Sequence, residues 1–145
     1  MPLTADDDIR DLLAAARTIA VVGASDRPER PSYGVMAALQ AHGYRTIPVN
    51  PQITGEHIHG EFVFRDLRQL GMPIDIVDIF RRSDAAGAVV DEAIAIGAKA
   101  VWMQLGVIDH LAAARAEAAG LKVVMDRCPK IDIPRLRVPR INQDT

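Results

Sequence analysis

The sequence predicts a doubly wound α/β domain, in which a mostly parallel β-sheet is covered by helices on both faces. Short runs rich in valine and isoleucine recur along the chain, which favours strands that are buried on both sides. Helical patterns of about ten to fourteen residues separate these runs, an alternation that is typical of parallel sheets. A length of 145 residues fits one domain with a single core.

The first expected elements are a helix, a strand and a second helix. Apolar residues share one helical face over Asp6 to Arg17, and the acidic start suits the positive end of a helix dipole. Thr18 to Val22 is a β-branched apolar run, which favours a buried strand. Ser32 to His42 has a helical pattern, with Ser32 as the expected cap and Gly43 as the stop.

The alternation of strands and helices continues along the rest of the chain. Tyr44 to Val49 is expected to form a strand that ends at Asn50 and Pro51, because proline cannot continue the ladder. The later expected elements are a short extended piece at Phe62 to Phe64, a helical turn at Asp66 to Leu70, a strand at Ile74 to Phe80, a helix that Ser83 or Asp84 caps and Gly97 ends, a strand at Lys99 to Met103, a helix from Asp109 to Ala119 and a strand at Leu121 to Met125.

The last part of the chain lacks a clear period. We expect one domain over residues 1–133, with the helix in 1–17 packed on it. Proline and arginine are frequent after Lys130, so we expect residues 134–145 to form an extended or disordered tail, or one that packs on a neighbour. Self-association or a protein partner therefore remains open.

The first loop after a strand carries the signature of a phosphate site. Right-handed crossovers place all the loops that follow parallel strands at one edge of the sheet, where they can line a common crevice. Gly23, Ala24 and Ser25 join a strand to a helix there, and backbone N–H groups in such a turn can bind an anion. Arg27 and Arg30 add positive charge, so we expect a phosphate-bearing ligand, although an ordinary turn with solvated arginines remains open.

Two further loops at this edge carry candidate ligand contacts. Arg81 and Arg82 stand before a helix N-terminus, where guanidinium groups and the helix dipole favour the same anion, although surface charge alone explains either arginine equally well. Core packing is favoured for the Trp102 ring, whereas Gln104 and Gly106 lie in the following loop and are better placed to touch a ligand.

Other cofactors fit the pattern less well. Ser25 stands where the dinucleotide fingerprint has its second glycine, and Asn50 ends the strand where an NAD site usually has an acid. NAD is therefore disfavoured. NADP is less so, since Arg27 and Arg30 could accept its 2′-phosphate.

Metal binding and covalent catalysis are also disfavoured. His57 and His59 have no third ligand nearby, which argues against a metal site. The segment around Ser25 is not a nucleophile elbow and has no evident histidine and aspartate partners, so no catalytic residue is assigned. Cys128, near the same edge, is either a buried small hydrophobe or a thiol in reach of a ligand.

Composition excludes several classes of partner. The net charge is -2, whereas a nucleic-acid-binding surface normally needs a basic excess. No apolar stretch approaches the roughly 20 residues of a membrane span, and the N-terminus is acidic where a signal peptide would be basic. With a single cysteine besides, we expect a cytoplasmic protein with no membrane or nucleic-acid partner.

Taken together, these segments resemble the small stand-alone CoA-binding proteins, whose Rossmann-like fold matches the N-terminal domain of the succinyl-CoA synthetase alpha subunit. The resemblance covers the chain from about Leu12 to Ile133. The matching segments are IAVVGASDRPERPSYGV, VNP at Val49 to Pro51, IFRRSD at Ile79 to Asp84, WMQLGV at Trp102 to Val107 and MDRCPK at Met125 to Lys130.

The resemblance implies that coenzyme A or an acyl-CoA lies across the carboxyl edge of the sheet. By carry-over, the ligand contacts are Gly23, Ala24 and Ser25 at the pyrophosphate, Arg27 and Arg30 near the phosphates, Asn50 and Pro51 beside the adenosine, Phe80, Arg81 and Arg82 along the flank, and Trp102, Gln104 and Gly106 toward the pantetheine arm. Cys128 falls where the synthetases carry the cysteine of an NCPG segment and is a candidate thiol contact.

The same resemblance implies binding without catalysis. In the synthetases a second domain carries the histidine that is phosphorylated, whereas this chain ends 15 residues after Lys130. We therefore expect no enzymatic activity. Two alternatives stay open at this point: an NADP-binding oxidoreductase or nucleotide sensor, and thiol chemistry that holds CoA on Cys128 as a mixed disulfide.

Overall fold

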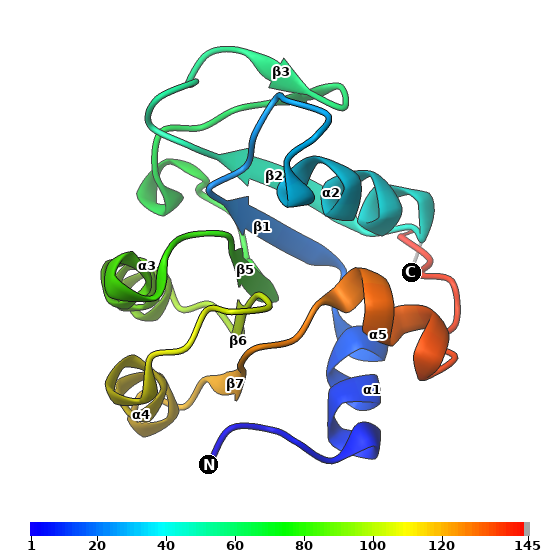
Figure 1. Cartoon of the computed structure of the whole chain (residues 1–145), viewed down its shortest axis with the longest axis vertical. Coiled ribbons are helices and arrows are strands. Elements are labelled where there is room, and N and C mark those ends of the chain that lie inside the picture. Colours follow the sequence, from blue (N-terminus) through cyan, green and yellow to red (C-terminus); the bar gives the residue numbers. More distant parts are fainter. Residues whose placement is uncertain (144–145) are drawn as a thin grey trace.

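A parallel sheet of five strands forms the centre of the molecule (Figure 1). A computed structural model describes residues 1–143. In chain order the strands are β1 (Thr18–Val22), β2 (Arg45–Val49), β5 (Ile76–Ile79), β6 (Ala100–Met103) and β7 (Lys122–Val124). They lie in the order β2-β1-β5-β6-β7, so the direction of strand addition reverses between β1 and β5. In open α/β sheets such a reversal marks the place where ligands bind.

Helices cover both faces of this sheet, which confirms the predicted doubly wound α/β class (Figure 1). One face carries α1 (Asp6–Ala15), α2 (Pro31–Ala41) and α5 (Pro129–Arg135), and the other carries α3 (Ser83–Ala95) and α4 (His110–Ala118). Each face has its own apolar core, because successive strand residues point to opposite sides.

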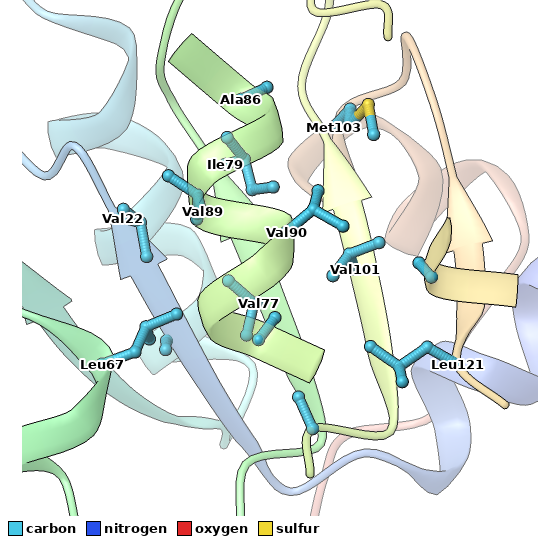
Figure 2. Packing of buried hydrophobic residues seen from close by; sticks show 14 of the residues in the cluster. Val22, Leu67, Val77, Ile79, Ala86, Val89, Val90, Val101, Met103 and Leu121 are labelled. Carbon is cyan, nitrogen blue, oxygen red and sulfur yellow. The ribbon is translucent and has the colours of Figure 1, made fainter. Parts of the chain in front are cut away.

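The buried core under α3 and α4 is made of aliphatic side chains and Met103 (Figure 2). Val90 of α3 packs with Val77 of β5 and Val101 of β6. The alternate residues of these strands, such as Asp78 after Val77 in β5, therefore face the other layer, where α1, α2 and α5 lie.

A small hairpin between β2 and β5 was not expected in this form. The sequence predicts one extended piece at Phe62 to Phe64, whereas the structure pairs β3 (His57–Ile58) with β4 (Glu61–Phe62) in antiparallel fashion. His59 and Gly60 make the turn, both with positive φ, which a tight hairpin favours. A 3₁₀ turn, η1 (Leu67–Gln69), follows at the predicted place.

The predicted helix caps Ser32 and Ser83 or Asp84 were wrong. Helix α2 begins one residue earlier at Pro31, a residue favoured in the first turn, and Ser32 lies inside it. Helix α3 begins at Ser83, and no side chain caps it. The Ser32 hydroxyl instead accepts from the N–H of Ser25 in the preceding loop, and the Ser83 hydroxyl donates to the carbonyl of Gly106 in the loop after β6.

The end of the chain differs from the expected tail. Helix α5 runs through residue 133, and Val138 and Ile141 beyond it are buried. Ile141 lies so close to Gly43 that a Cβ on that glycine would come within 2.2 Å of the Ile141 carbonyl oxygen. The last two residues of the predicted tail, 144 and 145, lie outside the described part of the chain.

Residues 1–143 contain neither a candidate membrane-spanning helix nor a candidate metal site. No helix there combines the length and the apolar character that crossing a bilayer needs. No group of three or more His, Cys, Asp or Glu side chains gathers there in a way that could hold a metal ion.

Candidate functional site

A cavity of about 980 Å³ opens where the loops after β1, β2, β5 and β6 meet. Its volume is at the upper end of the range for ligand pockets, about 300–1,000 Å³. Most of the residues predicted from sequence line it: Gly23, Ser25, Arg27, Arg30, Asn50, Phe80, Arg81, Arg82, Gln104, Gly106 and Cys128. The crossover argument therefore brings residues from five separate loops to one place, since Cys128 follows β7.

Gly23 makes the closest backbone approach in this cavity. Its φ is +88°, and a Cβ there would lie 2.3 Å from the carbonyl oxygen of Phe80. Its N–H donates to the carbonyl of Val49 at 2.9 Å. The turn after β1 is thus wedged between β2 and β5, which only glycine allows.

Ser25 is held differently from the expectation. Its backbone N–H donates to the hydroxyl of Ser32 at 3.0 Å instead of facing the cavity. Its own hydroxyl accepts from the N–H of Arg27 at 3.1 Å, which leaves the hydroxyl proton for another acceptor. Of the backbone N–H and the hydroxyl of Ser25, only the hydroxyl can therefore still donate to a phosphate.

Asn50 ties two of the loops together. Its Nδ2 donates to the carbonyl of Ala24 at 2.9 Å, and its Oδ1 accepts from the N–H of Gln52 at 2.9 Å. A strand-ending asparagine can make both bonds at once, whereas an aspartate could not donate. The residue that disfavours NAD in the sequence thus has a structural use here.

Positive charge surrounds the mouth of the cavity. Among the described residues, four arginines and one acid line it: Arg27, Arg30, Arg81, Arg82 and Asp26. Only Arg82 of these arginines makes an ion pair within residues 1–143, an exposed contact of 3.2 Å with Asp84. Helices α2 and α3 both begin at this wall, so the positive ends of their dipoles add to the same field.

Hydrogen bonds hold the loop after β6 against its neighbours. The Ser83 hydroxyl donates to the carbonyl of Gly106 at 3.2 Å and accepts from the N–H of Ile108 at 2.9 Å. The N–H of Gly106 donates to Asp126 at 2.7 Å. This wall of the cavity is therefore fixed by residues from three different loops.

An acid beneath the cavity was missed by the sequence reasoning. Asp78 in β5 is 0% exposed, and the end of the Gln104 amide that faces it, assigned as the nitrogen because it can donate to the acid, lies 2.8 and 3.0 Å from the two Asp78 oxygens. Burial raises the pKa of Asp78 well above its ordinary value. An acid inside the apolar run IDIVDIF was the available signal.

Three predicted site residues do not line the cavity. Trp102 is fully buried, and its ring N–H donates to the carbonyl of Arg127 at 2.8 Å, as core packing would have it. Ala24 is buried, and Pro51 is exposed outside the wall. Cys128 does reach the wall, with a free thiol and 7% exposure.

Several lining residues were not named in advance. They are Asp26, Pro31, Ser32, Val35, Gln52, Ile53, Leu105 and Val107. Most of them neighbour a predicted residue in the same loop, so the loops were right and the choice within them was incomplete.

Comparisons with known proteins give a consistent result. A family model described as CoA binding domain matches residues 17–134. The uncharacterized protein YneT of Bacillus subtilis is 39% identical over 124 residues, which cover 86% of this chain and 90% of YneT. A hypothetical protein from Pyrococcus horikoshii is similar in structure, with a TM-score of 0.88, 36% identity and coverage of 94% of this chain and 96% of that one.

A likeness of fold alone extends to a larger protein. The dinucleotide-forming acetyl-coenzyme A synthetase 1 of Ca. Korarchaeum cryptofilum matches with a TM-score of 0.68 and 22% identity. The match covers 82% of this chain and 28% of the synthetase. The Rossmann-like arrangement of the sheet therefore recurs as one part of a longer chain.

Proposed function

The chain belongs to the CoA binding domain family, as the resemblance predicted, and from this we propose that it binds coenzyme A or an acyl-CoA in the cavity without acting on it. The ligand lies across the carboxyl edge of the sheet, over the point where strand order reverses.

The arrangement of arginines supports this proposal most directly. Coenzyme A carries two separate phosphate groups, the pyrophosphate and the 3′-phosphate of the ribose. The cavity has two separate groups of arginines, Arg27 and Arg30 after β1, and Arg81 and Arg82 after β5. Arginine binds phosphate oxygens through paired N–H groups, and a helix N-terminus stands beside each group.

The rest of the wall is suited to an uncharged arm. Phe80, Leu105 and Val107 contribute apolar surface next to Gln104 and Cys128. Pockets of this kind combine apolar contacts with a few well-placed polar groups. We assign this part of the wall to the pantetheine arm and its thiol or acyl end.

Calorimetric titration tests the proposal against its alternative. We expect coenzyme A and acetyl-CoA to bind below millimolar concentration, and NADP to bind more weakly, since it carries a nicotinamide riboside in place of the flexible pantetheine arm. Tighter binding of NADP, or no binding of coenzyme A, would favour the nucleotide-sensor interpretation.

The absence of chemistry is tested separately. Acetyl-CoA incubated with the protein should keep its acetyl group, as followed by mass spectrometry of the small molecule. Release of the acetyl group at a rate above that of a protein-free control would contradict binding without catalysis.

A further inference from the structure

Asp78 is costly to the fold because no neighbouring charge offsets its burial. It is fully buried in the central strand, with Val21 of β1 and Trp102 of β6 as its register neighbours. Moving a carboxylate out of water costs several kcal/mol unless charged or hydrogen-bonded partners offset it. Loss of hydration is the cause that acts on its pKa, and no neighbouring charge contributes.

The partner of Asp78 stands between it and the cavity. Gln104 follows β6, and its side chain lies back toward β5, with the amide nitrogen 2.8 and 3.0 Å from the two Asp78 oxygens. Gln104 is only 6% exposed and lines the cavity, whereas Asp78 does not. The amide therefore links a buried charge to the ligand side of the wall.

This contact determines which end of the amide faces Asp78. Once Asp78 is ionised, above its raised folded pKa, its carboxylate can only accept hydrogen bonds, so it then selects the amide nitrogen of Gln104 and turns the carbonyl oxygen Oε1 away. A glutamine without such a partner could present either end. Because the pair is buried, the opposite orientation of the Gln104 amide costs free energy, since it would place Oε1 against the carboxylate oxygens of Asp78.

We propose that Asp78 is a positioning residue that fixes Oε1 of Gln104 as an acceptor for an N–H group of the ligand. This inference rests on the proposed binding of coenzyme A. The N–H donors of coenzyme A are its adenine amino group and the two secondary amides of the pantetheine arm. Gln104 shares its part of the wall with Phe80, Val107 and Cys128, so a pantetheine amide is the donor.

Such a contact gives the cavity selectivity for the arm. A buried group that is built to hydrogen-bond a ligand N–H discriminates strongly against ligands that lack it, because the group is then left without a partner. The arginines recognise any nucleotide with suitably spaced phosphates. The Asp78 and Gln104 pair distinguishes coenzyme A from nucleotides without pantetheine.

Two glutamines allow a matched test. Gln104→Met removes both polar ends of the amide at nearly constant volume, and Gln69→Met makes the same change at an exposed glutamine that does not line the cavity. Each variant is titrated with coenzyme A and with adenosine 3′,5′-bisphosphate, which lacks the arm. We expect Gln104→Met to lose about tenfold in affinity for coenzyme A alone, and Gln69→Met to change neither affinity more than about twofold.

Asp78→Asn tests the positioning step. Asparagine fills the same space but can donate or accept, so Gln104 is no longer held in one orientation. We expect weaker binding of coenzyme A, unchanged binding of the bisphosphate, and no further loss when Gln104→Met is added. If Asp78→Asn does not fold by circular dichroism, the comparison of Gln104→Met with Gln69→Met decides alone.

The outcomes separate this inference from the proposed function. If the unaltered protein does not bind coenzyme A, the proposed function fails, and the inference fails with it. If the unaltered protein binds and Gln104→Met weakens both ligands equally or neither, only the inference is overturned.

Discussion

Two acids at opposite ends of β5 show how differently the two edges of the sheet are built. Asp75, at the amino edge, accepts hydrogen bonds from the N–H groups of Arg17 and Thr18 at 2.8 and 2.9 Å, and Lys99 lies 3.3 Å away. Asp78, three residues later, has the Gln104 amide as its hydrogen-bond partner. The partners of Asp75 are two backbone N–H groups and a lysine, whereas the partner of Asp78 is a side-chain amide on the wall of the large cavity.

The pKa values of the two acids reflect this difference in their partners. Burial acts to raise the pKa of Asp75, but the hydrogen bonds from Thr18 and Arg17 and the charge of Lys99 lower it overall. Burial raises the pKa of Asp78 without opposition. Charges at the amino edge are thus neutralised within the fold, while the carboxyl edge keeps polar groups and arginines directed at a cavity, as a ligand site requires.

The largest expected effect tests how tightly the carboxyl edge is built. Gly23→Ala combines a positive φ with a Cβ 2.3 Å from the Phe80 carbonyl, so we expect a loss of about 3 kcal/mol in stability and no measurable binding of coenzyme A. Gly55→Ala is the matched control, because Gly55 has the same φ of +88° but no atom within 4 Å.

The control isolates the contact with Phe80 from the cost of the backbone conformation. Gly55→Ala should cost about 1 kcal/mol, measured by urea denaturation like its counterpart. Equal losses at both glycines would show that the turn after β1 is not wedged between its neighbouring strands.

The next effect concerns affinity and removes the charge that distinguishes the carboxyl edge. Arg27→Ala combined with Arg82→Ala should weaken coenzyme A by about 1–3 kcal/mol for each lost arginine–phosphate contact, measured by titration calorimetry. Arg45→Ala, an exposed arginine at the amino end of β2, should leave the affinity unchanged. An unaltered affinity in the double variant would mean that the phosphates bind elsewhere.

Much of this edge was predictable from the sequence because each strand is recognisable from its own run of apolar residues. The apolar runs show where the strands end. The crossover rule, which does not depend on side-chain detail, then places the loops that follow them at one edge. Trp102 was assigned to a ligand by resemblance and to the core by its position within a strand, and its burial favours the second. A strand interior is a stronger indicator than the motif that contains it.

What the sequence could not reveal depends on contacts between distant residues. Ser32 and Ser83 resemble helix caps, but their hydroxyls bond to Ser25 and to Gly106 in other loops. The packing of Ile141 against Gly43 joins segments almost a hundred residues apart, and no periodic pattern in the sequence predicts it. Local patterns predict what a residue can bond, and only the fold decides which partner it meets.

A smaller effect is expected at the amino edge. Asp75→Asn keeps one acceptor of the carboxylate and loses its charge, so we expect a loss of about 1–2 kcal/mol at pH 7, measured by urea denaturation. Because the folded pKa is lowered, this contribution is complete above the unfolded value of about 3.9 and disappears as the pH falls through the folded value. A difference that persists undiminished at pH 2 would contradict this assignment.

The smallest expected effect has the opposite sign, and it is the one that tells the two acids apart. The raised folded pKa of Asp78 means that the native state holds a proton that the unfolded chain has released, so stability falls as the pH rises through this interval. Asp78→Asn should therefore stabilise the protein by about 1 kcal/mol at pH 8, and the gain should shrink toward pH 4. A residue kept for the fold would not destabilise it, whereas a residue kept for a ligand can, because selection for function tolerates such a cost. If Asp78→Asn gains stability while its affinity for coenzyme A falls, Asp78 is part of the site. If the variant loses both stability and affinity, Asp78 serves the fold, as Asp75 does.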